Sequence, residues 1–294
     1  MLTDKLKNQL HLHFIVFIWG FTAILGALIS VSAIPLVFLR VVLASITLAI
    51  FFLIKKMTFK IDKVGILKLL LGGVLIALHW ITFFHAIKVS NISTTLVTMS
   101  TSAVFVALFD PVFNNRKILS YEVFLAALAL VGFVIIFQIS DEYRLGVFYA
   151  LTSAILLAFF SILNGKNIKK YKAGHIAFYE LFFASIFIFM VLLIQGDLIN
   201  SISKVSPSDL LYLLILATIC TAYPFVVVTN LLHKMSPFTI VLTNNLEPVY
   251  GIVLAILIFG SKEKMDMTFY IGALFIFSAV ILNGLMKLKA KYNS

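Results

Sequence analysis

The sequence predicts an all-α, polytopic membrane protein of ten transmembrane helices, built as two five-helix halves with opposite orientations (a 5+5 inverted repeat). Three observations lead to this fold class. Hydrophobic residues make up 62% of the chain and charged residues 12%, whereas about 25% of an ordinary globular domain is charged. The apolar residues form runs long enough to cross a bilayer, and the two parts of the chain repeat each other's pattern. A soluble core of this size would not cover so much apolar side chain, which a bilayer accommodates.

Transmembrane helices are expected where about 20 mostly apolar residues follow one another. Ten segments meet this requirement: 12–32, 35–54, 65–87, 91–113, 120–139, 144–164, 174–195, 208–231, 236–260 and 268–286. They lack the alternation of barrel strands. The first segment is too long for the core of a signal peptide, so we expect it to be retained. Ser206-Pro207 and Ser236-Pro237 provide a helix cap and a first-position proline where the eighth and ninth segments begin.

Basic residues set the expected orientation. With the N-terminus in the cytoplasm, 17 of the 23 Lys and Arg residues fall on the cytoplasmic side and 5 on the other, and Arg40 remains within a span. Because cytoplasmic loops carry such an excess, we expect a multi-pass protein of the cell (plasma or inner) membrane with both termini in the cytoplasm. The net charge of +11 follows from this distribution. The charges do not gather on one face, so no nucleic-acid partner is expected.

Two alignments indicate an internal repeat. Lys88-Val-Ser-Asn91 matches Lys234-Met-Ser-Pro237 at an offset of 146 residues, and Phe38-Leu39-Arg40 matches Phe178-Tyr179-Glu180 at an offset of 140. We therefore divide the chain into residues 1–140 and 141–294. Because each half contains an odd number of helices, the second half enters the membrane in the opposite sense. Secondary transporters built in this way bind substrate near the membrane midplane.

Glu247 is the strongest candidate for a substrate-binding residue. It lies 11 residues into the ninth segment, which at ~1.5 Å per residue is about 16 Å deep. A charge at that depth costs at least ~2.5 kcal/mol and therefore needs a function or a partner. Asn244 shares its helical face, and Pro248 frees a backbone carbonyl nearby. This group would suit a polar or cationic substrate, and a coupling proton is a further candidate ligand of Glu247; the alternative is a structural carboxylate bonded to a neighbouring helix.

The fourth segment is expected to supply the opposite wall of the site. Thr98 and Thr101 align with Asn244 and Glu247 at the offset of 146, and Ser102 lies beside them. Their hydroxyl groups either line the site or, as often happens in membrane helices, bond to their own backbone.

Two other segments carry further candidates. In the third segment, His79 is able to titrate or bind an anionic group, and Trp80 either forms an aromatic wall or faces lipid. In the eighth segment Tyr223 is a candidate, and Pro224 after it predicts a kink.

Arg40 and Glu180 occupy matching places in the two halves with opposite charges. Their segments begin on opposite membrane faces, so their depths differ by roughly 15 Å in a core about 30 Å thick. We therefore expect no direct salt bridge. Gating, packing and substrate contact remain alternative roles for both.

No catalytic residue, metal ion or cofactor is expected. His79 and His85 fall on different helical faces, Cys220 is the single cysteine, and the sequence contains no phosphate-binding Gly-Lys-Ser/Thr loop. Hydrolase motifs are also absent. Small residues at four-residue spacing in the sixth segment predict close helix packing, with a homodimer interface as the alternative. They are Gly146, Ala150, Ala154 and Ala158.

The chain resembles the EamA-type transporters of the drug/metabolite transporter (DMT) superfamily over almost its whole length. The resemblance is closest in residues 88–97 and 236–250, and 259–263 is similar to the family's Gly-Glu turn; in the first half Asn114-Asn115-Arg116 stands where Gly-Glu-Arg is usual. The resemblance implies a cavity lined by the third, fourth, eighth and ninth spans. It also implies cargo among amino acids, other metabolites and drugs, often carried outward. Asn245 and Tyr250, within 236–250, are counted among the candidate substrate-binding residues.

The predicted function is secondary-active transport, with export the expected direction, of a small metabolite such as an amino acid or amine, by alternating access. Three alternatives were weighed: an intramembrane enzyme, an accessory membrane scaffold and a passive channel. The first two would need a reactive cluster or a large partner surface. A channel would show flux too fast for a conformational cycle and no counterflow.

Overall fold

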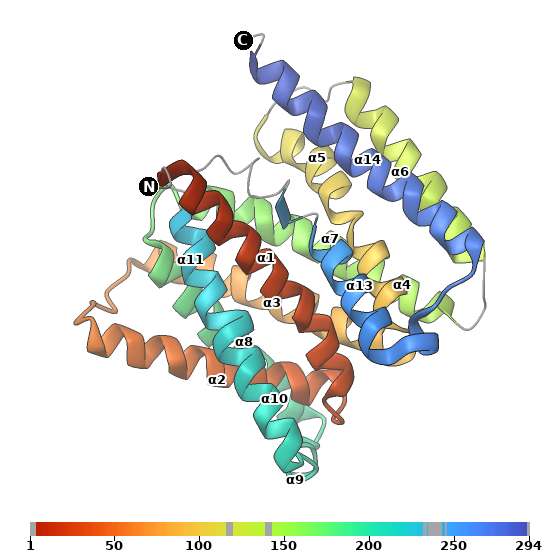
Figure 1. The fold of residues 1–294 in the computed structure, drawn as a ribbon. Helices are drawn as coiled ribbons and strands as arrows, with labels where there is room; N and C mark the ends of the chain where they lie inside the picture. The colour runs from red at the N-terminus through yellow and green to blue at the C-terminus, as the bar shows by residue number, and fades with distance from the viewer. Residues whose placement is uncertain are drawn as a thin grey trace.

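The computed structural model describes residues 4–115, 120–138, 143–231, 234, 243–244 and 246–292. All regular secondary structure within these ranges is helical, which confirms the all-α fold class. The start of α1 and the end of α14 lie toward the same side of the molecule, which we call the terminal end (Figure 1). The other side is called the distal end.

The first half contains six described helices. They are α1 (Asp4–Leu28), α2 (Ala33–Ile54), α3 (Lys63–Val89), α4 (Ile92–Met99), α5 (Ser102–Phe113) and α6 (Ser120–Gln138). The predicted fourth segment is broken into α4 and α5 at Ser100 and Thr101. Their hydroxyl groups donate to the backbone oxygens of Leu96 (3.1 Å) and Thr98 (2.7 Å), and such bonds compete with regular helix geometry.

The second half repeats this order with additional short elements. They are α7 (Arg144–Asn167), α8 (Ala173–Ile194), α9 (Leu198–Ser203), α10 (Pro207–Ala217), the π-helical turn η2 (Thr218–Ala222), α11 (Tyr223–Leu231), α13 (Glu247–Phe259), the 3₁₀ turn η3 (Gly260–Glu263) and α14 (Met267–Tyr292). Ser206 caps α10 with Pro207 at its start, as predicted. Near the predicted kink at Pro224, the π-helical turn interrupts the helix. The other predicted cap, Ser236-Pro237, lies outside the described residues.

Seven of the described helical spans are long and apolar enough to cross a membrane. Shorter apolar helical stretches cover Val123–Ile136 and Met267–Ala279, and α13 has 13 residues. The count of ten transmembrane helices therefore stays a prediction. The ninth predicted segment accounts for part of the difference, because much of 236–246 is outside the described ranges.

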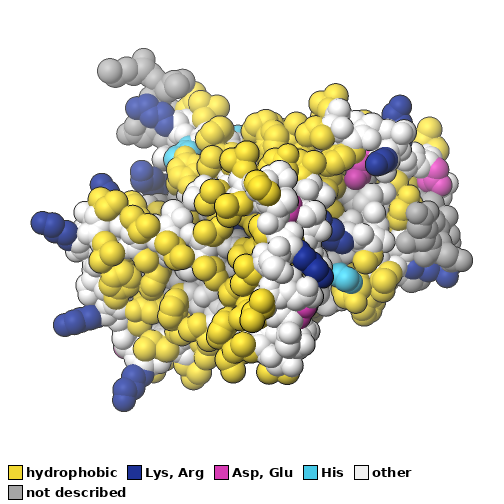
Figure 2. Space-filling model, turned by 90° about the horizontal axis from the view of Figure 1, so that it is seen from below, with side chains coloured by type: hydrophobic (Ala, Val, Ile, Leu, Met, Phe, Trp, Pro, Cys, Tyr) yellow, Lys and Arg dark blue, Asp and Glu magenta, His cyan; other side chains and the backbone are white. Residues whose placement is uncertain are grey.

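The outer surface is hydrophobic, as expected for a chain surrounded by lipid. Ile54, Leu67, Ile194 and Leu257 are 72%, 68%, 83% and 76% exposed. Hydrophobic side chains cover most of the face shown in Figure 2, and Lys and Arg side chains project at its edge. In water such a surface would be unfavourable, so these side chains are expected to contact acyl chains.

Contacts between the halves form the core of the bundle. Helix α3 packs against α7 and α8, and α2 packs against α8, whereas α6 and α14 pair along one flank (Figure 1). The predicted small-residue stripe on α7 faces inward: Ala150, Ala154 and Ala158 are fully buried, and a Cβ at Gly146 would overlap Ser90. The stripe therefore serves packing within the chain and is not a dimer surface.

Gly73 allows the close approach of α3 to α8. A Cβ there would lie 2.7 Å from the backbone oxygen of Glu180 and 2.8 Å from Phe183 Cβ. We expect Gly73→Ala to lower the free energy of unfolding by about 1–3 kcal/mol, because the two helices must move apart. Thermal unfolding in detergent measures this change. Gly165→Ala on α7 is the matched control, since a Cβ there has no neighbour within 4 Å; equal midpoints for the two variants would contradict the expectation.

Candidate functional site

A cavity of about 210 Å³ lies between the two halves of the chain. The first half contributes Trp19 and Thr22 on α1, Arg40 on α2, the middle of α3 and the region of α4 and α5, and the second half contributes residues of α7, η2, α11 and α13. The polar part of the lining consists of Thr22, Arg40, His79, Ser100, Ser102, Ser161, Asn244 and Glu247. Apolar and aromatic side chains such as Trp80, Phe83 and Phe160 form the rest. An apolar cavity with a few converging polar groups is the usual form of a small-molecule site.

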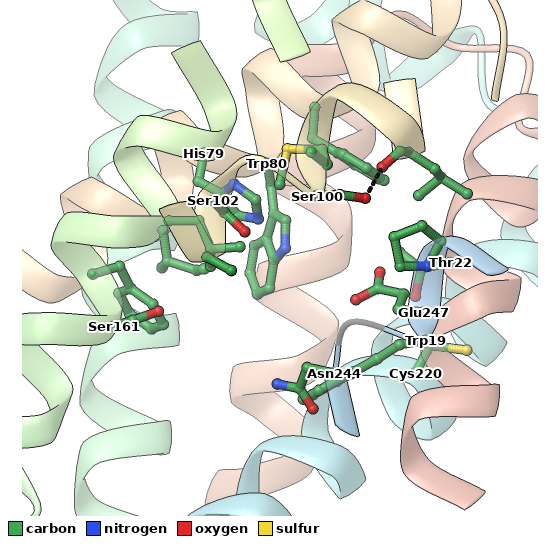
Figure 3. Close-up of a pocket in the computed structure, with 18 of the residues that line it drawn as sticks. Trp19, Thr22, His79, Trp80, Ser100, Ser102, Ser161, Cys220, Asn244 and Glu247 are labelled. Atoms are coloured by element: carbon green, nitrogen blue, oxygen red, sulfur yellow. Dashed lines mark hydrogen bonds between the residues drawn. The ribbon is translucent and has the colours of Figure 1, made fainter. Parts of the chain in front are cut away.

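Glu247 lies where α13 begins, and its carboxylate points into the cavity next to Asn244 (Figure 3). Pro248 follows as one of the first residues of that helix. Glu247 and Asn244 both line the cavity, but α13 begins at Glu247 and does not include Asn244, so the shared helical face expected from the sequence is not the reason for their proximity. The side-chain oxygen of Asn244 is buried and has no hydrogen-bond partner in the described part of the chain. Beside the Glu247 carboxylate, Asn244 thus has a buried amide oxygen without a partner among the described residues.

Arg40 is buried, at 2% exposure, on the cavity wall. Its Nε donates to Thr221 Oγ1 over 2.7 Å, and its guanidinium carbon lies 4.0 Å from the Trp80 ring centroid and 5.4 Å from that of Phe84. A cation over an aromatic face is stabilised by the ring quadrupole. Nη1 has no partner among the described residues. Arg40 is thus held at one nitrogen and over two rings, while Nη1 stays without a partner in the described structure.

The π-helical turn η2 provides the anchor for Arg40. The Thr221 hydroxyl accepts from Arg40 and donates to the backbone oxygen of Leu216 over 2.6 Å. π-Helical turns are rare and frequently lie at functional sites. No periodicity in the sequence indicated this turn, which also brings Cys220 to the cavity.

His79 and Trp80 both line the cavity from α3. His79 Nδ1 lies 3.0 Å from the Ser153 backbone oxygen, and Ser153 Oγ donates to the His79 backbone oxygen over 2.8 Å. These bonds fix the histidine to α7. Trp80 lies beneath Arg40 and is 6% exposed, so it forms an aromatic wall rather than facing lipid.

Several candidate residues lie elsewhere. Thr98 and Thr101 are buried beside the cavity but do not line it, because the break between α4 and α5 turns Ser100 and Ser102 toward it instead. Tyr223 is 41% exposed, and its hydroxyl lies 2.6 Å from His11 Nε2. Tyr250 packs edge-on against Phe17. Asn245 lies outside the described residues.

Glu180 occupies a separate buried position between α8, α3 and α7. Asn164 Nδ2 donates to its Oε2 over 3.0 Å, Oε1 has no partner in the described ranges, and a Cβ at Gly72 would overlap it. Glu180 does not line the cavity. The described residues form no ion pair between Glu180 and Arg40, as expected from the sequence, and the two charges at matching positions have different surroundings.

Sequence reasoning missed most of the apolar lining and several polar or aromatic residues of the cavity. Among them are Trp19, Thr22, Ser100, Ser161, Cys220 and Phe225. Trp19 and Thr22 are three residues apart and therefore share one face of α1, and this spacing could have identified them as neighbours. The sequence does not identify the others, because the position of a side chain along an apolar helix does not indicate which helix it packs against.

Comparison with known proteins agrees with this architecture. Residues 10–138 and 144–285 each match the model of the EamA-like transporter family, which confirms the resemblance seen in the sequence. A crystal structure described only as that of a protein has a TM-score of 0.67 at 14% identity, covering 97% of this chain and 99% of that one. At such identity the likeness concerns the fold alone. No curated protein matches the chain significantly.

Proposed function

The chain belongs to the EamA-like transporter family, whose model matches both of its halves, and from this premise we propose that it is a secondary-active exporter of a small amino acid-like metabolite. Family membership and the many apolar helices make it a multi-pass membrane protein of transporter type. The substrate class, the direction and the alternating-access mechanism are our proposal.

The topology we propose is ten spans in two inverted halves, residues 1–140 and 141–294, with both termini in the cytoplasm. The two family matches divide the chain between residues 138 and 144. Helices α5 and α13 end at Phe113 and Phe259, which are 146 residues apart, and positive-φ residues Asn115 and Gly260 follow. These correspondences support the repeat inferred from the sequence. The excess of Lys and Arg on the terminal side supports the orientation in a plasma or inner membrane.

The substrate class rests on one observation: Arg40 and Glu247 line the same cavity but form no ion pair with each other in the described structure. Each charge in an apolar cavity needs a partner. A zwitterion supplies both, since its carboxylate would accept from Arg40 Nη1 and its ammonium group would donate to Glu247 and Asn244. A simple amine would use only Glu247 and would leave Arg40 unpaired.

The size of the cavity favours a small metabolite over a drug-sized molecule. Its volume of about 210 Å³ is below the roughly 300–1,000 Å³ typical of pockets for larger ligands. Trp80, Phe160 and Phe225 give the remaining wall an aromatic character, which suits an apolar side chain.

Counterflow in liposomes tests the function. Vesicles containing the purified protein and an excess of one unlabelled amino acid should accumulate the labelled form transiently, as a carrier with an alternately exposed site requires. Each member of an amino acid panel is compared with the amine that lacks its carboxylate. Rapid equilibration without overshoot would indicate a passive channel, and no flux for any panel member would reject the substrate class.

A further inference from the structure

A buried carboxylate of the second half binds the beginning of α4 in the first half. Glu263, in η3, is 5% exposed. Its Oε1 accepts from Ile92 N (3.0 Å), and its Oε2 accepts from Ser93 N and Ser93 Oγ (both 2.9 Å). Helix N-termini have unpaired N–H groups and a partial positive charge, so a carboxylate is favourable there. The cap of α4 is thus supplied by the opposite half.

A second carboxylate makes a similar connection. Asp209, near the start of α10, is 1% exposed. It accepts from Ser30 N and Ser30 Oγ, both over 2.6 Å, and Ser30 lies in the connection between α1 and α2. Lys88 also donates to the backbone oxygen of Ile29 in that connection. The start of α10, the connection between α1 and α2 and the end of α13 lie at the distal end of the molecule (Figure 1).

These contacts bear on the wall of the cavity. Leu96, one turn into α4 from Ile92, lines the cavity, and Gly251 of α13 packs so closely that a Cβ there would overlap Leu96. Glu263 therefore holds the first turn of α4. The next turn carries Leu96, which forms part of the cavity wall on the distal side. On the other side the lining reaches Ser161 in the second half of α7, a helix that runs toward the terminal end.

Within the described ranges, no buried carboxylate at the terminal end joins the two halves as Glu263 does. The turn that corresponds to η3 follows α5, and the sequence there contains Asn114 and Asn115 instead of a carboxylate. Asn114 Nδ2 donates within its own helix, to Asp110 Oδ1 over 2.6 Å.

Charged contacts between the halves at this end are exposed to solvent. Lys170 pairs with Asp62 at 3.0 Å with both side chains about half exposed, and such pairs are weak. His175 and Tyr179 also bind the α2–α3 connection. None of these four residues lines the cavity.

We propose that Glu263 and Asp209 are positioning residues for transport, which lock the distal end so that the cavity of the resting protein opens toward the terminal end. The inference rests on the alternating-access transport proposed above. During the cycle both carboxylates must release their partners in the other half. Because the terminal end lacks buried carboxylate bonds of this kind in the described structure, the distal lock sets the preferred conformation.

Side-specific labelling tests the proposal. Ser161→Cys in a Cys220→Ser background places one thiol on the cavity, and a membrane-impermeant maleimide is applied to one face of membrane vesicles at a time. In this background the thiol should react about tenfold faster from the face that carries the termini. Glu263→Ala should raise the rate from the opposite face by about tenfold, because losing the lock shifts the balance of the two conformations. Asp209→Asn should act in the same direction.

Two further variants serve as controls. Ser93→Ala removes hydroxyl bonds to Glu263 but keeps both backbone donors, so it should give a smaller shift if Glu263→Ala does not fold. Asp266→Asn is the matched control, because Asp266 is three residues away and caps α14 within its own half; it should leave the labelling unchanged.

Unchanged labelling in Glu263→Ala and Ser93→Ala, or faster labelling of the parent protein from the distal face, would overturn the lock. Counterflow separates this result from the transport proposal. Counterflow with unshifted labelling rejects the lock alone, whereas shifted labelling without counterflow of any panel member rejects the proposed substrate class and leaves the lock supported.

Discussion

Glu247→Gln should slow counterflow of the transported amino acid by about 100-fold, equivalent to about 2.7 kcal/mol at 1.36 kcal/mol per tenfold change. The substitution keeps the size of the side chain and the proline that follows it, but it removes the negative charge that faces the cavity. The substrate's ammonium group then has only neutral oxygens to bind, and a charge in an apolar cavity without a counter-charge is strongly disfavoured.

Two comparisons isolate the role of the charge. Glu247→Asp retains a carboxylate at a shorter reach and should transport more than the glutamine variant. Thermal unfolding of Glu247→Gln should stay near that of the wild type, because Glu247 forms no ion pair in the described part of the structure. Wild-type counterflow by a folded Glu247→Gln protein would reject the assignment of Glu247 to the substrate site.

The helices could be predicted from the sequence because hydropathy and length are local properties. Cap and proline signals placed the start of α10 correctly at Ser206 and Pro207. The break at Ser100 and Thr101 was not predicted, since the run Ile92–Phe113 is apolar enough on average to form one membrane span and Ser and Thr also occur inside intact membrane helices. The π-helical turn at Thr218–Ala222 also had no local signal, and it matters because it supplies Thr221 to Arg40.

The part of the candidate site that could be predicted contains a charged residue, because a charge inside the membrane requires a partner or a function. Glu247 and Asn244 were found from depth and helical spacing, and both line the cavity. Arg40 was assigned no definite role, because its surroundings depend on α3 and η2, which are distant in sequence. In the sequence, Trp19 and Phe225 cannot be distinguished from aromatic residues that face lipid. Only the packing of α1 and α11 brings them to the cavity.

Arg40→Gln should lower counterflow of the amino acid by about 100-fold and should leave transport of the corresponding amine almost unchanged. The difference is expected because Nη1 is the unused donor at the cavity, and only the amino acid has a carboxylate for it. The selectivity between the two substrates should therefore change by about the same factor. Competition counterflow with both labelled compounds measures that ratio directly, so a loss of folded protein, which lowers both rates equally, does not imitate the result.

Thr221→Val provides the matched comparison, because it removes the acceptor of Arg40 Nε while the guanidinium and its contact with Trp80 remain. It should reduce amino acid counterflow only several-fold, because the lost hydrogen bond is not made to the substrate and the cation–π contact with Trp80 still orients the guanidinium. If Arg40→Gln lowered amine and amino acid counterflow to the same extent, Arg40 would be acting on the conformational cycle. Its role would then be gating, the alternative that the sequence left open.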